Sequence, residues 1–435
     1  MTNSTDPVTP TAGTKDRTTH TTGRFSRRAL ITGSAVGAGV GLALGAGGTA
    51  TVTAIRAQNA GAGYAEPTVE PSLGAEGTEP GYGGESLPCH GAHQAGITTL
   101  PAAHARYLSF TLKPGTDRDA ISRMLRILTD DIEGLVSGAG PLADPEPELA
   151  SRPSRLSITV GVGSELVKRV DPAKVPKWLA PLPAFKLDEL TPAYTGGDLL
   201  IVLQADSQMP ISHAARMMHR DLSSFAELSW FQQGFRQARG AEAPGKTMRN
   251  LMGQVDGTVN PAPEEEDFAG LVWIDGTAPN EQWLKNGSAL VFRRIRMELD
   301  TWDQVDRPGR EDTIGRTLDT GGPITGGDES TPMDFDAKNA LGLPAIPITA
   351  HSRRAHSTDP NERIYRRAIN YDEGTEAGLV FVCYQRDPRK QFVPIQERLD
   401  ELDMLNEWVT HTGSAVFAML PGFESGDIIG ASLFA

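Results

Sequence analysis

An aspartate enclosed by glycines is the most distinctive chemical feature of the sequence. Residues 250–261 read Asn-Leu-Met-Gly-Gln-Val-Asp-Gly-Thr-Val-Asn-Pro, with Asp256 between Gly253 and Gly257. A lone Asp-Gly pair is typical of a tight turn. Two flanking glycines, however, let a backbone approach a flat ligand closely while one carboxylate projects onto it. Asp256 is therefore a candidate general acid–base.

A histidine and an arginine fifteen residues apart form the second candidate pair. His351 lies in the run Ala-His-Ser-Arg-Arg-Ala-His at 350–356, and Arg366 lies in Tyr-Arg-Arg-Ala-Ile at 365–369. A lone histidine is more often a core or surface residue than a ligand, although imidazole is a common metal ligand. Arginine is a permanently charged, forked donor that suits the stabilisation of developing negative charge.

Elements that could position these residues follow from the hydrophobic periodicity. Alternation or continuous apolar runs predict strands, and three-to-four spacing predicts helices. We expect strands at 107–112, 156–162, 198–204, 288–299, 378–384 and 416–420, and helices at 121–132, 211–221 and 394–410. The order of elements restarts after residue 245, and βα units do not repeat. This order indicates an α+β fold made of two related domains.

The first ninety residues differ in composition from the rest. Residues 1–28 are polar and end in an arginine pair, while 29–54 carry no charge and are rich in glycine and alanine. Because a membrane anchor is richer in leucine and isoleucine, we interpret 1–57 as a twin-arginine export signal, with an uncleaved anchor as the alternative. Residues 58–88 predict a flexible tether rich in Gly, Pro and Glu. The predicted domains are then 89–245 and 246–435.

Composition and charge exclude several classes of protein. The chain has 435 residues, of which 39% are hydrophobic and 22% charged, so it is neither a polytopic membrane protein nor wholly disordered. A net charge of -14 argues against nucleic acid as a partner. Two cysteines exclude a disulfide framework and a cysteine-ligated iron–sulfur cluster. Cys89-His90-x-x-His93 has metal-ligand types but lacks a fourth partner.

Taken together, these stretches resemble the dye-decolourising peroxidase family from about Gln94 to the C-terminus. The most specific element is Gly253-x-x-Asp256-Gly257-Thr258. Supporting matches are His-Gln-Ala-Gly-Ile at 93–97, Gly-Asp-Leu-Leu at 197–200, Arg-Arg-Ile-Arg-Met at 293–297, Gly-Arg at 315–316 and Leu-Pro-Gly at 420–422. The resemblance implies two ferredoxin-like domains with antiparallel sheets, similar to the dimeric α+β barrel superfamily. It also implies one non-covalent haem b per chain, in the C-terminal domain.

The resemblance also implies roles for individual side chains. His351 would be the proximal iron ligand, and Asp256 would move the proton of bound H2O2 on the distal face. Arg366 would contact the haem and stabilise charge as the O–O bond breaks. His356 is the alternative iron ligand, and Arg367 the alternative distal arginine.

Further haem contacts follow from the same resemblance. The backbone of Gly257, Thr258 and Val259 would pass over the porphyrin, and Arg316 would pair with a propionate. His356 and Ser357 occupy positions where the family commonly has Asn-Pro, so they are also candidate haem contacts.

The implied function is a secreted haem peroxidase that uses H2O2 to oxidise dyes, phenolics or other bulky organic reductants. A carboxylate acid–base predicts an acidic optimum, because a carboxylate still accepts protons where an imidazole is already protonated. Bulky reductants would need aromatic relays, for which Trp302, Trp408, Tyr371 and Tyr384 are candidates. The alternatives are a haem-handling, iron-releasing (deferrochelatase-like) protein of an iron uptake system and an exported binding protein without haem.

The predicted partners and location follow from the same interpretation. We expect the twin-arginine translocase to act during export, and the mature protein to be extracellular or associated with the cell envelope. Homo-oligomerisation is left open.

Overall fold

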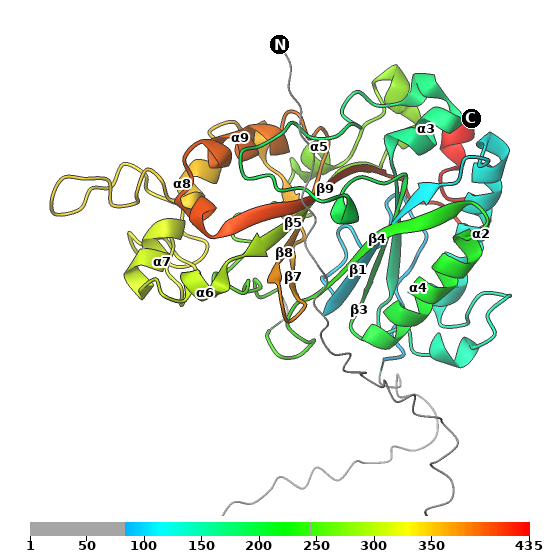
Figure 1. The fold of residues 1–435 in the computed structure, drawn as a ribbon, viewed down its shortest axis with the longest axis horizontal. Helices are drawn as coiled ribbons and strands as arrows, with labels where there is room; N and C mark the ends of the chain where they lie inside the picture. Colours follow the sequence, from blue (N-terminus) through cyan, green and yellow to red (C-terminus); the bar gives the residue numbers. More distant parts are fainter. Residues whose placement is uncertain (1–82, 244) are drawn as a thin grey trace, which may run out of the picture. The chain divides into compact units, whose positions relative to one another are not determined.

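The computed structural model describes residues 83–243 and 245–435 of the chain (Figure 1). The predicted export signal at 1–57 and most of the predicted tether at 58–88 therefore lie outside the described residues. Within the described part, no helix is long and apolar enough to cross a membrane.

The N-terminal half is a four-stranded antiparallel sheet with helices on its outer face. Its strands are β1 (His104–Leu112), β2 (Ser157–Val162), β3 (Leu199–Ala205) and β4 (Ala226–Phe235), and its helices are α2 (Arg118–Ser137), α3 (Ser164–Val170) and α4 (Gln208–Leu222). The strand order is β2-β3-β1-β4. Helices α2 and α4 lie side by side along this sheet (Figure 1), and their apolar sides are fully buried against it.

The C-terminal half repeats this topology. Its strands are β5 (Ser288–Met297), β6 (Tyr365–Arg366), β7 (Ile369–Asp372), β8 (Ala377–Gln385) and β9 (Val409–Met419). Its helices are α5 (Phe268–Val272), α6 (Leu299–Trp302), α7 (Arg307–Ile314), α8 (His351–Ala355) and α9 (Phe392–Leu402). In each half the first strand lies between the last two, as β1 lies between β3 and β4 and β5 between β8 and β9. The expected pair of related, ferredoxin-like α+β halves is thereby confirmed.

The two sheets join at both edges and close into a barrel. Strand β2 pairs with β9 through Gly161–Met419 and Val162–Ala418, and β4 pairs with β7 through Phe235–Asn370. Both junctions are short, so side chains must contribute to closure. Large apolar residues from both halves fill the interior, among them Tyr107, Leu200, Trp230, Phe292, Val380, Tyr384 and Phe417.

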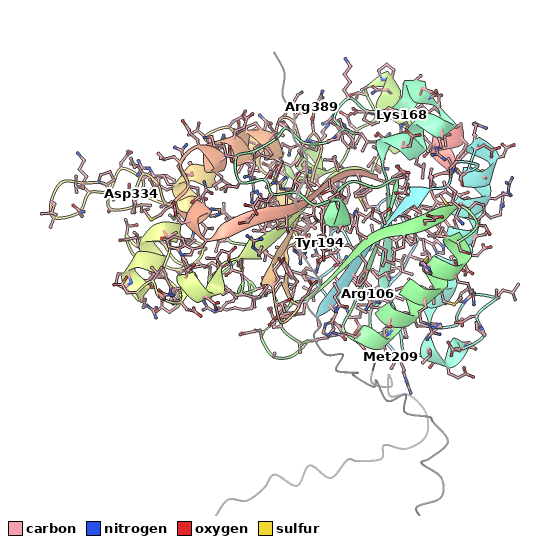
Figure 2. The ribbon with its side chains drawn as sticks, in the orientation of Figure 1. Arg106, Lys168, Tyr194, Met209, Asp334 and Arg389 are labelled. Carbon is pink, nitrogen blue, oxygen red and sulfur yellow. The ribbon has the colours of Figure 1, made fainter. Side chains whose placement is uncertain are left out.

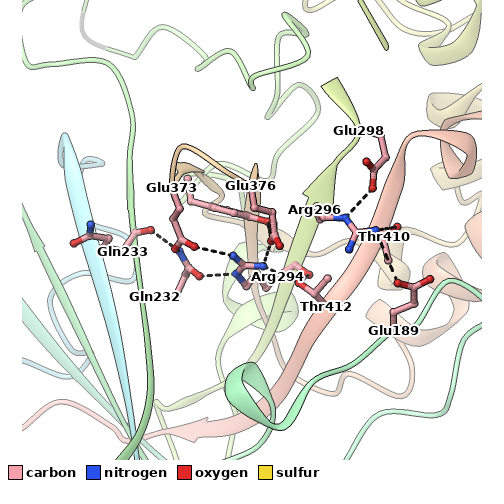
Figure 3. A network of polar contacts seen from close by, with 11 residues as sticks. Glu189, Gln232, Gln233, Arg294, Arg296, Glu298, Glu373, Glu376, Thr410 and Thr412 are labelled. Carbon is pink, nitrogen blue, oxygen red and sulfur yellow. Dashed lines mark hydrogen bonds and ion pairs between the residues drawn. The ribbon is translucent and has the colours of Figure 1, made fainter. Parts of the chain in front are cut away.

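Arg294 links the two halves where the backbone pairing is sparse (Figure 3). Its guanidinium, 2% exposed, donates to Gln232 of β4 at 2.7 Å and to Thr412 of β9 at 2.9 Å. It also pairs with Glu373 and Glu376. The rings of Tyr194 and Tyr371 lie 4.1 and 4.2 Å from its central carbon. A buried arginine with this many partners holds the β4 side of the barrel to the β5 side.

The predicted helix at 394–410 is wrong in its second half. Helix α9 ends at Leu402, and strand β9 begins at Val409. Asp403 adopts an extended backbone (φ -83°, ψ 126°), and its side chain accepts a hydrogen bond from the Leu405 amide. This capping interaction begins a short 3-10 turn and ends the helical pattern. Strands β4 and β7 were not predicted, and the boundaries of the two domains remain predictions.

Candidate active site

The loop that carries Asp256 has positive φ angles at both of its flanking glycines. Gly253 and Gly257 adopt φ values of 84° and 134°, in the region that favours glycine. Val259 also has a positive φ, 58°, which is a strained conformation for a β-branched residue. Strain of this kind persists only where surrounding contacts impose it, and it is concentrated at functional sites.

Asp256 lies beside Arg366, as the resemblance implied. Its Oδ1 is 3.8 Å from Nη1 of Arg366, and its Oδ2 accepts a hydrogen bond from Nδ2 of Asn250 at 3.2 Å. The side chain keeps 18% of its surface accessible. A carboxylate that is oriented by one amide, close to one cation and still accessible is suited to moving a proton.

Arg366 is held by the same loop. Asn260 donates to the carbonyl of Arg366 at 3.1 Å and accepts from its amide at 2.7 Å, which fixes the loop to β6. The guanidinium of Arg366 donates to the carbonyl of Thr258 at 2.5 Å. Neighbouring side chains on a strand point to opposite faces. Arg367 accordingly points inward, where it is buried near the hydroxyl of Tyr365 at 3.5 Å. The geometry favours Arg366 over Arg367 as the distal arginine.

His351 begins the short helix α8 and is bonded to a buried carboxylate. Its Nδ1 lies 2.6 Å from Oδ2 of Asp403, so Nε2 is left for a metal. Burial lowers the pKa of His351, but the neighbouring Asp403 carboxylate outweighs this effect and raises the pKa overall. His356, the alternative ligand, is exposed, and its ring lies 5.0 Å from that of Phe335. These contacts favour His351.

Asp256 and Arg366 lie near enough to His351 to influence its charge. Asp256 raises and Arg366 lowers the pKa of His351, so all three lie within electrostatic range of one another. His351 and Arg366 keep 34% and 27% of their side-chain surface accessible. Ile295 and Phe381, on the outer face of the C-terminal sheet, are half-buried against an apolar cluster that includes Met252 from the Asp256 loop. An imidazole with a free Nε2, an acid–arginine pair within electrostatic range of it and nearby apolar side chains together fit a haem.

The remaining predicted haem contacts, at positions 258, 259, 316 and 357, differ in their burial and hydrogen bonds. Thr258 is half-buried and Val259 exposed. Arg316 is buried and donates to the carbonyls of Gly321 at 2.7 Å and Glu329 at 3.3 Å. Burial lowers its pKa, and Arg366 lowers it further, so Arg316 is near the site. Ser357 accepts a hydrogen bond from the Asp359 amide at 3.1 Å.

Two tryptophans connect the Asp256 loop to the outside. Trp302 is fully buried and donates from Nε1 to the carbonyl of Met252 at 3.0 Å. Its ring meets that of half-buried Trp408 edge to face, with centroids 5.1 Å apart. Tyr371 and Tyr384, the other relay candidates, are buried in the barrel.

Several residues of the site were not predicted as functional. Asp403 was hidden in a helical pattern, and a single sequence carries no signal that would have singled it out. Asn250 and Asn260 lie within the Asp256 stretch but were given no role. Arg236, just after β4, is within electrostatic range of Asp256. Burial and the nearby Arg367 lower the pKa of Arg236 to about 10.

The Cys89-His90-x-x-His93 motif forms no metal site. His90 pairs with Glu133 at 2.8 Å, and His93 stacks on Trp273 with centroids 3.7 Å apart. In residues 83–243 and 245–435, no three His, Cys, Asp or Glu side chains are grouped as metal ligands. Cys89 and Cys383 are both free thiols.

A two-domain α+β barrel with an acid–arginine pair near a carboxylate-bonded histidine is consistent with a haem-dependent oxidoreductase. Comparison with family models specifies the class further. The Dyp-type peroxidase N-terminal model matches residues 94–236, and the C-terminal model matches residues 247–424. The chain therefore belongs to the Dyp-type peroxidase family, whose members bind haem b.

Relatives and solved structures agree with this assignment. The chain is 35% identical to the dye-decolorizing peroxidase of Thermobifida fusca over 361 residues, 79% of this chain and 84% of that protein. It is 30% identical to the deferrochelatase of Escherichia coli K12 over 373 residues, 80% and 87% of the two chains. A DyP-type peroxidase structure from Cellulomonas bogoriensis superposes with a TM-score of 0.79 at 44% identity, covering 81% of this chain and 99% of that one. Ferric DtpA from Streptomyces lividans gives 0.76 at 37% identity, covering 81% and 98%.

Proposed function

We propose that this chain is an exported haem peroxidase that reduces H2O2 and oxidises dyes, phenolics or other bulky organic reductants. The observation that carries the proposal is the Asp256–Arg366 pair, with side chains 3.8 Å apart, within electrostatic range of His351. A protein that only carries haem has no need of a distal acid–base pair.

Each residue has a chemical task in this proposal. Haem b, when bound, supplies the iron on which peroxide is reduced. His351 holds that iron through Nε2, and Asp403 fixes the orientation of the ring and strengthens its donation. Asp256 takes the proton from one peroxide oxygen and delivers it to the other, which leaves as water. Arg366 stabilises the negative charge that develops on the departing oxygen.

Bulky reductants would be oxidised at the protein surface. A large dye cannot enter a closed pocket, so electrons must reach the site through side chains. Trp302 touches the Asp256 loop and Trp408 touches Trp302, which makes the two rings a continuous aromatic contact. We assign the relay to this pair in preference to Tyr371 and Tyr384, because the pair ends at the half-buried Trp408, whereas both tyrosines are buried in the barrel.

The proposed place of action is outside the cytoplasm. The arginine pair at 27–28 and the uncharged stretch at 29–54 support passage through the twin-arginine translocase. The protein would take up haem in the cytoplasm, cross the membrane folded, and act in the extracellular space or at the cell envelope.

A second candidate function is the release of iron from haem. It is favoured by the 30% identity to deferrochelatases over 80% of the chain. In that case the same pocket would bind haem as a substrate, and the products would be free porphyrin and iron.

One experiment separates the two functions and tests His351. The purified protein is loaded with haem, and haem stoichiometry, dye oxidation with H2O2 and metal-free porphyrin are measured. We expect one haem per chain, peroxide-dependent dye oxidation and no porphyrin; His351→Ala should lose the haem or its axial bond, and His356→Ala should not. Accumulation of porphyrin without dye oxidation would favour iron release. Absence of haem, or loss of its axial bond only in His356→Ala, would contradict the assignment.

A further inference from the structure

A cavity lies beside β9, at the segment that connects α3 to β3. It has a volume of about 500 Å³ and opens where the segment between α3 and β3 passes over β9. This segment is attached to β9 by the backbone bridges Asp188–His411 and Thr195–Ser414. The passage of the segment across β9 can be followed in Figure 1, and Tyr194 near its end is labelled in Figure 2. None of the lining residues belongs to the candidate active site.

The wall of this cavity is mostly apolar. Apolar residues form most of the lining, chiefly the run 179–184 of the connecting segment together with Leu190, Ala415 and Val416. Small-molecule sites typically have volumes of 300–1,000 Å³ and an apolar lining with a few fixed polar groups. Both the volume and the lining of this cavity fall within that description.

The charged groups in the wall are all acidic. Asp188 and Asp198 line the cavity, and no lysine, arginine or histidine is among the residues that the structure describes in the lining. Asp188 is neutralised by the buried Arg293, with which it forms an ion pair. Asp198 forms no ion pair with another described residue, so its charge is offset only by the more distant Lys168 and Arg169.

Asp198 is fixed by the backbone around it. Its Oδ2 accepts a hydrogen bond from the Leu112 amide at 2.8 Å. Burial is the main influence on this carboxyl and raises its pKa, although Lys168 and Arg169 act in the opposite direction. Arg169 is directed elsewhere, since it donates to the Lys113 carbonyl at 2.7 Å. A partly desolvated carboxylate that is not directly paired with a cation attracts one.

We propose that this cavity is a binding site for an amphiphilic organic cation, such as a planar aromatic amine or cationic dye. The apolar wall would bury the rings, and Asp198 would pair with the positive charge. The site binds independently of peroxide, so it does not depend on the proposed peroxidase function.

The test compares two planar three-ring dyes of opposite charge. Binding of methylene blue, a cation, and resorufin, an anion, is measured by equilibrium dialysis with the full haem-loaded chain and no peroxide. We expect saturable binding of methylene blue, weaker binding of resorufin, and about a tenfold weaker affinity for methylene blue in Asp198→Asn. The asparagine keeps the acceptor for Leu112, and the matched control Glu227→Gln removes an exposed carboxylate of β4 outside the cavity.

A second variant tests the same site without altering Asp198. Ala184 is exposed at the cavity wall, so Ala184→Arg adds a positive charge with little effect on packing. We expect this variant to weaken methylene blue binding and strengthen resorufin binding. The proposal is overturned if methylene blue does not bind, if both dyes bind equally, or if Asp198→Asn and Ala184→Arg behave like Glu227→Gln.

Discussion

At the scale of single residues, the site depends on pairs in which one side chain sets the chemistry of another. Asn250 orients Asp256, Arg366 lies beside that carboxylate, and Asp403 holds His351. A histidine that donates to an anion is a stronger electron donor to a metal than one bonded to a neutral acceptor. Asp403 is therefore a positioning residue whose effect reaches the metal only through His351.

Replacement of Asp403 by asparagine tests this role. Asp403→Asn keeps an acceptor for the Leu405 amide but removes the negative charge from His351. We expect haem to be retained, the iron–histidine stretching frequency of the reduced protein to fall, and the reaction with H2O2 to slow by about tenfold to a hundredfold. Resonance Raman and stopped-flow absorbance measure these effects, with the exposed Asp427→Asn as the control. An unchanged frequency would show that Asp403 does not act through His351.

At the scale of elements, the site is assembled from a strained loop, an edge strand and two short helical segments. Asn260 fixes the loop to β6, and the end of α9 brings Asp403 under His351. The Asp256 loop and Arg366 could be predicted, because glycines and an arginine pair are visible in the sequence. Asp403 could not be predicted, because the periodicity of Leu399, Leu402 and Leu405 continues past it. Its functional contact is with His351, which is far away in the sequence.

The contact between Trp302 of α6 and Trp408, the residue before β9, can be tested by mutation. Trp408→Phe keeps an aromatic ring in contact with Trp302. Phenylalanine is oxidised only at a higher potential than tryptophan, so the ring at position 408 can no longer relay electrons. We expect the oxidation of bulky dyes to fall severalfold, while small phenols that reach the pocket are oxidised as before. Steady-state kinetics with both substrates measure this, and Trp273→Phe is a matched control outside the contact. If the oxidation rates of dyes and small phenols fell equally, Trp408 would contribute to the stability of the protein and not to an electron relay.

At the scale of the whole molecule, the two halves are one closed barrel and not two separate bodies. The short junctions β2–β9 and β4–β7 and the Arg294 cluster hold them together. The order of elements was enough to predict two related halves. A barrel was implied only by the resemblance to the dimeric α+β barrel superfamily. The strands β4 and β7 that join the halves were not predicted, because β7 has only four residues and the alternation of β4 was overlooked.

Stability should depend on pH through a buried carboxyl between the outer helices. Burial and the nearby Asp221 raise the pKa of Asp131 on α2 to about 7. The unfolded chain loses this proton near pH 4 (~3.9), so stability falls as pH rises from about 4 to about 7. Asp131→Asn removes this penalty, and we expect its gain in unfolding free energy to be about 2 kcal/mol larger at pH 8 than at pH 5.

Denaturation by urea at both pH values measures this difference. The exposed neighbour Asp130→Asn serves as the control on the same helix. A gain that is the same at pH 5 and pH 8 would contradict a raised pKa for Asp131.

The central claim is that Asp256 moves the proton of H2O2 beside Arg366 and opposite His351. The most direct test mixes the haem-loaded protein with one equivalent of H2O2 and follows the Soret band by stopped-flow absorbance, in the wild type, Asp256→Asn and the control Asp427→Asn. The account predicts that Asp256→Asn retains haem and reacts about 10² to 10⁴ times more slowly, while the control is unchanged. If Asp256→Asn reacts at the wild-type rate with its haem intact, another group moves the proton and the assignment of the site is wrong.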